Sequence, residues 1–297
     1  MKQTTSVGAA RMSIVIAMLI FGTIGIFVRH VPLPSSVIAL VRGVVGTLFL
    51  LVFCRLRKTP LCGQTIRNNL GLLLLSGACI GFNWILLFEA YRYTTVATAT
   101  LCYYLAPVFV ILVAPILFGE KLTVRKGLCV VVALVGMVFV SGVTTAGLAG
   151  SGELLGILFG VGAAVLYASV VLMNKKLTQV QAFERTIVQL GAAALALLPY
   201  VVITQWGMEM DWSGLSIPLL LVMGIVHTGI AYALYFGGIK ELPAQTSALL
   251  SYIDPVSAII LSAVFLGERM TASGVVGAVL VLGATLLSEL PLHRGCK

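Results

Sequence analysis

Two ionisable residues lie deep inside apolar stretches of the sequence, where a charge is costly. Asp254 falls near the middle of the stretch 243–266, directly before Pro255, and His227 falls near the middle of 216–236. If these stretches cross a bilayer, a carboxylate at that depth costs about 2.5–3.5 kcal/mol, and residues kept at such a cost mark ion or substrate pathways. We therefore predict that Asp254 takes up and releases a proton inside the membrane, with His227 as its relay or partner.

Other interpretations of these ionisable groups stay open. A neutral Asp254 could cap backbone groups that Pro255 leaves unbonded. Glu89, near the end of the stretch 69–90, is a weaker candidate for proton coupling, because from there it could simply reach the membrane interface. The pair His227 and Asp254 is also the one candidate set for an intramembrane enzyme, but the sequence contains neither a GxSxG nor an HExxH motif.

Cysteine spacing gives no sign of a metal site. The six cysteines form no CxxC pair and show no Cys/His ligand spacing. We therefore expect neither a metal nor another cofactor.

A group of polar and aromatic residues is the predicted lining of a substrate cavity. A tyrosine buried in lipid needs a partner for its hydroxyl and should face the protein interior. The alternative is that these side chains only hold helices together. The predicted lining residues are Asn83, Trp84, Tyr103, Tyr104, Tyr232 and Tyr252.

The composition is that of an integral membrane protein. Apolar residues make up 60% of the 297 residues and charged residues 10%, with a mean hydropathy of +1.09, whereas soluble domains carry about 25% charge. The net charge of +9 comes from Lys and Arg in short segments between apolar stretches. No basic surface interleaved with aromatics is present, so we expect the lipid bilayer, and not nucleic acid, as a partner.

Ten stretches approach the ~20 apolar residues that cross a hydrocarbon core of about 30 Å. This predicts an all-α polytopic membrane protein with ten transmembrane helices. The predicted spans are 12–28, 35–54, 69–90, 95–118, 127–143, 153–173, 183–204, 216–236, 243–266 and 273–290.

The distribution of Lys and Arg predicts the orientation of these spans. If the N-terminus is cytosolic, fourteen basic residues lie inside and only Arg29, Arg92 and Arg269 lie outside. Basic residues concentrate in cytoplasmic loops. We therefore predict that both termini and the segment 55–67 are cytosolic and that 205–215 is external.

The segment 101–123, LCYYLAPVFVILVAPILFGEKLT, recurs 148 residues later as 249–271, LLSYIDPVSAIILSAVFLGERMT. Eight of the 23 positions are identical, and an offset of half the chain predicts two domains, residues 1–148 and 149–297. Because five helices per half is an odd number, the second half should enter the membrane from the opposite side, as inverted repeats of secondary transporters do. Pro107 and Pro255 are expected to kink equivalent helices where the halves meet.

Ten helices in two halves, each with a Pro-bearing helix followed by Gly-Glu-Lys/Arg-x-Thr, resemble the drug/metabolite transporter (DMT) superfamily and, within it, the EamA-type exporters. The resemblance covers about residues 12–290 and is most specific in the repeated segment. It implies transport of a small metabolite, often export of amino acids or related compounds and commonly linked to protons. It does not fix the substrate.

Further motifs have structural explanations. Gly119-Glu120-Lys121 and Gly267-Glu268-Arg269 are expected to cap helices locally. The glycine pairs Gly77/Gly81 and Gly156/Gly160 predict close helix packing.

Arg42 and Arg185 each lie within two turns of a predicted helix start. We expect their side chains to extend to the membrane interface as anchors. The alternative is a pairing of either with an acidic group such as Glu89 or Glu184.

We therefore predict a secondary active transporter, an exporter of a small zwitterionic, aromatic or amphipathic solute, which works by alternating access and is coupled to protons. It is expected in a bacterial inner membrane, as a multi-pass protein with both termini cytoplasmic. Its partners are a small-molecule substrate, protons and the bilayer, and the pattern does not distinguish a monomer from a homodimer. The alternatives are an uptake permease or facilitator of the same fold, an intramembrane enzyme and a non-transporting scaffold.

Overall fold

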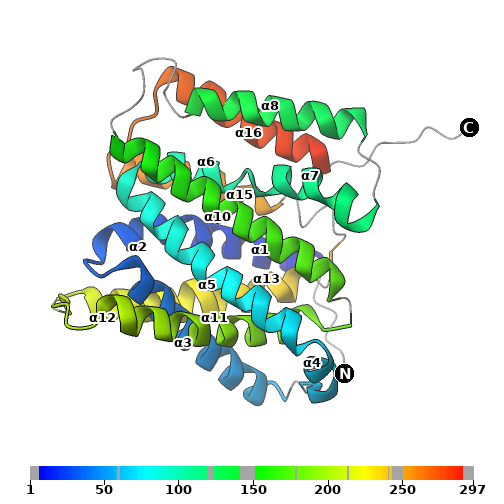
Figure 1. The fold of residues 1–297 in the computed structure, drawn as a ribbon, viewed down its shortest axis with the longest axis vertical. Coiled ribbons are helices and arrows are strands. Elements are labelled where there is room, and N and C mark those ends of the chain that lie inside the picture. The colour runs from blue at the N-terminus through cyan, green and yellow to red at the C-terminus, as the bar shows by residue number, and fades with distance from the viewer. Residues whose placement is uncertain are drawn as a thin grey trace, which may run out of the picture.

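The computed structural model describes residues 7–58, 61–119, 123–140, 151–177, 179–212, 214–239, 241–242 and 250–289. Every regular element in these ranges is a helix, as the composition predicts. The helices lie side by side in layers (Figure 1), with α8 and α16 at one edge and α3, α11 and α12 at the opposite edge. The predicted positions of both termini, and of Lys121 and Lys240, lie outside the described residues.

The first part of the chain forms eight helices over the described residues up to 140. They are α1 (Val7–Gly22), α2 (Ile24–His30), α3 (Ser35–Leu56), α4 (Gly63–Asn68), α5 (Leu70–Tyr93), α6 (Val96–Tyr103), α7 (Ala106–Phe118) and α8 (Val124–Val140).

The described residues from 151 onward form the remaining elements. They are α10 (Ser151–Lys176), α11 (Ala182–Gln205), α12 (Ser216–Val222), the π-helix η1 (Met223–Ile230), α13 (Ala231–Ile239), α15 (Ile253–Phe265) and α16 (Ala272–Glu289).

Seven helices or helix runs are long and apolar enough to cross a membrane, which confirms an all-α polytopic membrane fold. They are Val7–His30, Ser35–Leu56, Leu70–Tyr93, Val96–Phe118, Gly152–Lys176, Ala182–Gln205 and Ser216–Gly238. Three shorter apolar helices, Gly127–Val140, Ile253–Phe265 and Ala272–Leu287, overlap the other three predicted spans. Each of the corresponding predicted spans, 127–143, 243–266 and 273–290, includes residues that the structure does not describe, so the count of ten stays a prediction.

Both predicted kinks are short interruptions just before a proline. Between α6 and α7 the helix is broken at Tyr104 and Leu105, and α15 is preceded by a turn at Tyr252. Pro107 and Pro255 each lie in the first turn of the helix that follows. A proline is tolerated there because the N–H it lacks would have had no intrahelical partner.

Glycines let several helices approach closely. A Cβ on Gly77 would lie 2.5 Å from the Cβ of Ala192, which places α5 directly against α11 as the glycine pair predicts. A Cβ on Gly46 would lie 2.4 Å from Cγ2 of Thr228, so α3 and η1 touch backbone to side chain. This second contact positions a group in the site described next.

Candidate functional site

A cavity of about 270 Å³ lies in the middle of the bundle, bounded by residues of α1, α2, α3, α5, α6, α7, α10, α13 and α15. Apolar side chains such as Phe21 and Ile24 of α1 and α2 form part of its wall. Its polar and aromatic lining residues are Arg42, Trp84, Tyr91, Thr100, Tyr103, Tyr104, Tyr167, Tyr232, Tyr235, Ser251 and Asp254.

Most of the predicted lining residues reach this cavity. Trp84, Tyr103, Tyr104 and Tyr232 border it, and so does Pro107. The two exceptions are Asn83 and Tyr252. The concentration of aromatic faces around two charged groups suits a small amphipathic solute.

Asn83 and Tyr252 take other positions. Asn83 is buried and its side-chain amide donates a hydrogen bond to the backbone carbonyl of Ala163, so it joins α5 to α10. The ring of Tyr252 lies 6.3 Å from that of Tyr104, centroid to centroid. Neither Asn83 nor Tyr252 is among the residues that line the cavity.

Asp254 and Tyr104 connect the two helix interruptions across the cavity. The Tyr104 hydroxyl lies 3.0 Å from Oδ2 of Asp254, to which it donates a hydrogen bond, and 3.4 Å from the carbonyl oxygen of Ser251. Asp254 lies in the first turn of α15, where the helix dipole favours a negative charge. The two prolines therefore interrupt their helices at points that face each other.

Arg42 corrects an expectation from the sequence. Its side chain is only 4% exposed and borders the cavity, so it does not extend to the interface as an anchor. Nε donates a 2.8 Å hydrogen bond to Oγ1 of Thr228, and the guanidinium carbon lies 4.3 Å from the centroid of the Trp84 ring. The close approach of α3 to η1 at Gly46 makes this inward position possible.

Arg185 is half-buried and donates to the carbonyl of Asn174 at 3.4 Å. Glu184, the acidic partner considered for it, is buried and accepts a 2.9 Å hydrogen bond from the backbone N–H of Cys62. Neither arginine therefore pairs with Glu89 or Glu184 in the described part of the chain.

His227 lies apart from Asp254. It is 2% exposed, its Nε2 lies 2.8 Å from Oγ1 of Thr23, and its ring meets that of Phe27 edge to face at 4.7 Å. His227 is not among the lining residues, and no interaction joins it to Asp254 over the described ranges. The structure therefore does not bring together the predicted relay pair.

Glu89 is half-buried on α5 and is also absent from the cavity lining. Of the three carboxyl and imidazole groups proposed for proton coupling, Asp254 alone borders the cavity.

Glu268 forms a cross-link between distant helices, contrary to the local cap expected of it. Its carboxylate accepts from the backbone N–H of Val96, the first residue of α6, at 2.8 and 3.1 Å, and it forms an ion pair of 3.2 Å with Arg29. Arg29 also donates to the carbonyl of Thr94 at 2.6 Å. We call this set of contacts the Glu268 link. The equivalent Glu120 lies outside the described residues, whereas Gly119 ends α7 in the left-handed conformation expected of a helix cap.

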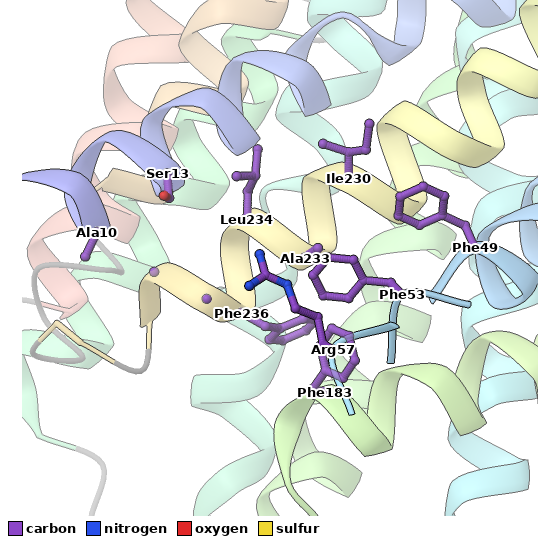
Figure 2. Close-up of a pocket in the computed structure, with 12 residues that line it drawn as sticks. Ala10, Ser13, Phe49, Phe53, Arg57, Phe183, Ile230, Ala233, Leu234 and Phe236 are labelled. Atoms are coloured by element: carbon purple, nitrogen blue, oxygen red, sulfur yellow. The ribbon is translucent and has the colours of Figure 1, made fainter. Parts of the chain in front are cut away.

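A second cavity, of about 410 Å³, lies between α1, α3, α11 and the η1–α13 segment (Figure 2). Ser13 of α1 and Leu234 of α13 border it on one side, while the guanidinium of Arg57 lies among phenylalanine rings. These rings belong to Phe53, Phe183 and Phe236, and Phe49 borders the cavity farther from Arg57. We call it the Arg57 cavity.

Helix α13 separates the two cavities. Tyr232 and Tyr235 border the central cavity, while Ala233 and Leu234 border the Arg57 cavity. Side chains of α13 therefore contribute to both cavities.

Sequence reasoning missed three tyrosines and one arginine of the central cavity. Tyr235 follows Tyr232 by three residues and Tyr91 follows Trp84 by seven, so helical periodicity places each on the same face as a predicted residue. Tyr167 of α10 had no such partner. For Arg42 the sequence contained one indication of a role in the site, because an arginine within an apolar membrane span is energetically costly.

No group of three His, Cys, Asp or Glu side chains suited to a metal ion occurs among the described residues.

Comparison with known proteins identifies a family and relatives of similar sequence. The EamA-like transporter family model matches twice, over residues 9–142 and 154–290. An uncharacterized transporter of Bacillus subtilis, YxxF, is 31% identical over 97% of this chain and 93% of its own length. An uncharacterized transporter of Archaeoglobus fulgidus is 29% identical over 93% of this chain and 94% of its own. A solved crystal structure, 19% identical, superposes with a TM-score of 0.66 over 97% of this chain and all of its own, a likeness of fold.

Proposed function

Because this chain belongs to the EamA-like transporter family, we propose that it exports a small amphipathic metabolite by alternating access, in exchange for protons that bind at Asp254. We take residues 1–148 and 149–297 as two inverted halves that move relative to each other around the central cavity. The double match of the family model supports two equivalent halves.

The observation that carries this proposal is the hydrogen bond between Tyr104 and Asp254 at the cavity wall. It joins an ionisable group to the cavity and to both helix interruptions at once. Coupled transport requires that the binding of the solute and the binding of the coupling ion both change the conformation of the same helices. A proton or a solute that changes this contact would change how α6 and α15 pack.

Access to the cavity would then alternate between two ends. The Glu268 link holds together α2, α6 and the segment before α16, at the end that the basic-residue bias assigns to the exterior. The Arg57 cavity, beyond α13, lies toward the end of α3 that the same bias assigns to the cytosol. We propose that solute enters there and leaves where the Glu268 link opens.

Replacing Tyr103 by alanine is expected to lower solute affinity about tenfold while leaving folding intact. Tyr103 contributes an aromatic face to the cavity wall, and loss of such a contact removes about 1–2 kcal/mol of binding. Thermal-shift titration of the purified protein with amino acids, nucleosides and amines would identify a ligand, since ligands that bind the folded state stabilise it. Counterflow of that ligand in proteoliposomes then tests transport.

Tyr200→Ala is the matched control, because Tyr200 is 38% exposed on α11 and is not among the lining residues. Equal affinities in the two variants would contradict the cavity assignment. A protein that binds no solute class and supports no counterflow would contradict the proposed function as a whole.

The proposed orientation in an inner membrane can be tested at two surface positions. Cys62, between α3 and α4, is exposed, and its contact with the Thr65 hydroxyl lowers the pKa of its thiol below the usual value. More of it is therefore in the reactive thiolate form at neutral pH, and its labelling should fall as the pH drops through that pKa. Met208 precedes α12 and is 58% exposed. α4 and the loop before α12 lie at opposite ends of the bundle (Figure 1).

We expect a membrane-impermeant maleimide to label Met208→Cys, in a cysteine-free background, in intact cells. A variant that keeps Cys62 alone should be labelled only after the cells are permeabilised. The reverse pattern would invert the proposed topology.

A further inference from the structure

Arg42 is a buried cation that forms no ion pair in the part of the chain that the structure describes, and the Asp254 carboxyl, which borders the same cavity, instead accepts a hydrogen bond from Tyr104. The one ion pair among the described residues joins Arg29 to Glu268. Arg42 itself is 4% exposed and makes one hydrogen bond, from Nε to Thr228. Removing a charge from water without a partner costs several kcal/mol. An unpaired guanidinium at the wall of a cavity is therefore expected to favour an anion inside it.

The neighbours of Arg42 determine the orientation of its guanidinium and which of its nitrogens can donate hydrogen bonds to a ligand. The Thr228 hydroxyl donates to the carbonyl of Met223 at 3.1 Å, so its oxygen is free to accept from Nε of Arg42. Trp84 lies under the guanidinium at 4.3 Å. With Nε engaged and one face covered, the two terminal nitrogens remain as donors, and neither has an acceptor among the described residues.

We propose that Arg42 binds the carboxylate of the transported solute, which makes small organic carboxylates the substrate class of the central cavity. This rests on the proposed function. The planar fork of an arginine matches the two oxygens of a carboxylate. The cavity, at about 270 Å³, is smaller than the roughly 300–1,000 Å³ of sites for drug-sized ligands. Its tyrosine and tryptophan faces provide apolar contact for the rest of the solute, which an inorganic anion would not use.

The experiment compares acids with their neutral amides. Trp206→Phe with Trp212→Phe leaves Trp84 as the sole tryptophan, because the protein has three. Both replaced residues are exposed, at 83% and 45%, and lie outside the cavity. The fluorescence of Trp84 then reports binding directly beneath Arg42. The probes are L-phenylalanine and L-phenylalaninamide, L-leucine and L-leucinamide, benzoate and benzamide, and inorganic phosphate.

We expect at least one acid to bind about 10–100-fold more tightly than its amide, the factor for one hydrogen-bonded charge. In Arg42→Gln this preference should fall to threefold or less, and Arg42→Lys should keep part of it. Thr228→Val removes the acceptor of Nε but not the guanidinium, so it should keep the preference for the acid even if overall affinity falls. A structural role of Arg42 would lower both affinities together and leave their ratio unchanged.

The outcomes separate this inference from the proposed function. A protein that binds and exchanges a solute with equal affinity for acid and amide, or whose preference survives Arg42→Gln, overturns the role of Arg42 alone. Tighter binding of phosphate than of every organic acid also overturns the assigned substrate class. A wild-type protein that binds none of the probes overturns this inference, and the absence of counterflow with any solute class overturns the proposed function with it.

Discussion

Asp254→Asn is expected to abolish accumulation of solute against a gradient while preserving binding and counterflow. Asparagine keeps the shape of the side chain and still accepts from the Tyr104 hydroxyl, which lies 3.0 Å from Asp254, but it cannot bind and release a proton. One proton exchanged per solute supports about tenfold accumulation for each unit of pH difference, since one unit is worth 1.36 kcal/mol. In proteoliposomes with an imposed pH gradient, the variant should therefore only equalise solute across the membrane.

Two carboxyl variants complete this experiment. Glu153→Gln, at an exposed position in the first turn of α10, should behave as wild type. Glu89→Gln tests the weaker candidate, which lies outside the cavity lining, and should also retain accumulation. Wild-type accumulation by Asp254→Asn would mean that Asp254 has only a structural role. Loss of accumulation in Glu89→Gln alone would mean that Glu89 on α5 is the proton-coupling residue.

Glu268→Gln is expected to open the cavity more often toward the predicted exterior. The substitution removes the ion pair with Arg29 and weakens the two hydrogen bonds from the backbone of Val96. Hydrogen bonds to a charged group contribute about 1.5–3 kcal/mol, so the open population should rise about tenfold or more. A cysteine at Thr100, which lines the cavity, should then react about tenfold faster with an impermeant thiol reagent added outside.

The control is Glu209→Gln, an exposed carboxylate in the loop before α12, on the same predicted side. Exchanging the two charges, Arg29→Glu with Glu268→Arg, should restore the ion pair but not the acceptor for Val96, and so slow the labelling only in part. Equal labelling rates in Glu268→Gln and Glu209→Gln would mean that the Glu268 link does not gate the cavity.

The helices could be predicted well because lipid leaves few alternatives. In a bilayer every backbone group must be bonded within the chain, so apolar length alone identifies helices. The spans near 35–54, 69–90 and 183–204 match α3, α5 and α11 to within a few residues. The spans 127–143, 243–266 and 273–290, which include undescribed residues, match over a shorter length.

Site residues could be predicted where helical periodicity determines their position. They could not be predicted where contacts between distant segments determine it. Trp84, Tyr104 and Asp254 could be placed near the cavity from their depth and from the repeat. The inward position of Arg42 depends on Gly46 and Thr228, which lie on different helices, and no local pattern encodes that meeting. The hydrogen bond between Glu268 and Val96, which lie 172 positions apart in the chain, could not be predicted for the same reason.

The π-helix η1 marks a difference in backbone structure between the two segments that match the family model. At the offset of 148 residues, Met223–Ile230 corresponds to residues 75–82 of α5, which are α-helical. A π turn closes its hydrogen bonds over one more residue than an α turn, and one residue is about 100° of rotation. Trp84 and Tyr232, which follow these residues in the two segments, both border the cavity. Side chains before the π-helix are therefore expected to be rotated relative to their counterparts in α5. We expect a chimera assembled from two copies of the first half to replace this π-helix with an α-helix, and so to lose the position of Thr228, which accepts the hydrogen bond of Arg42.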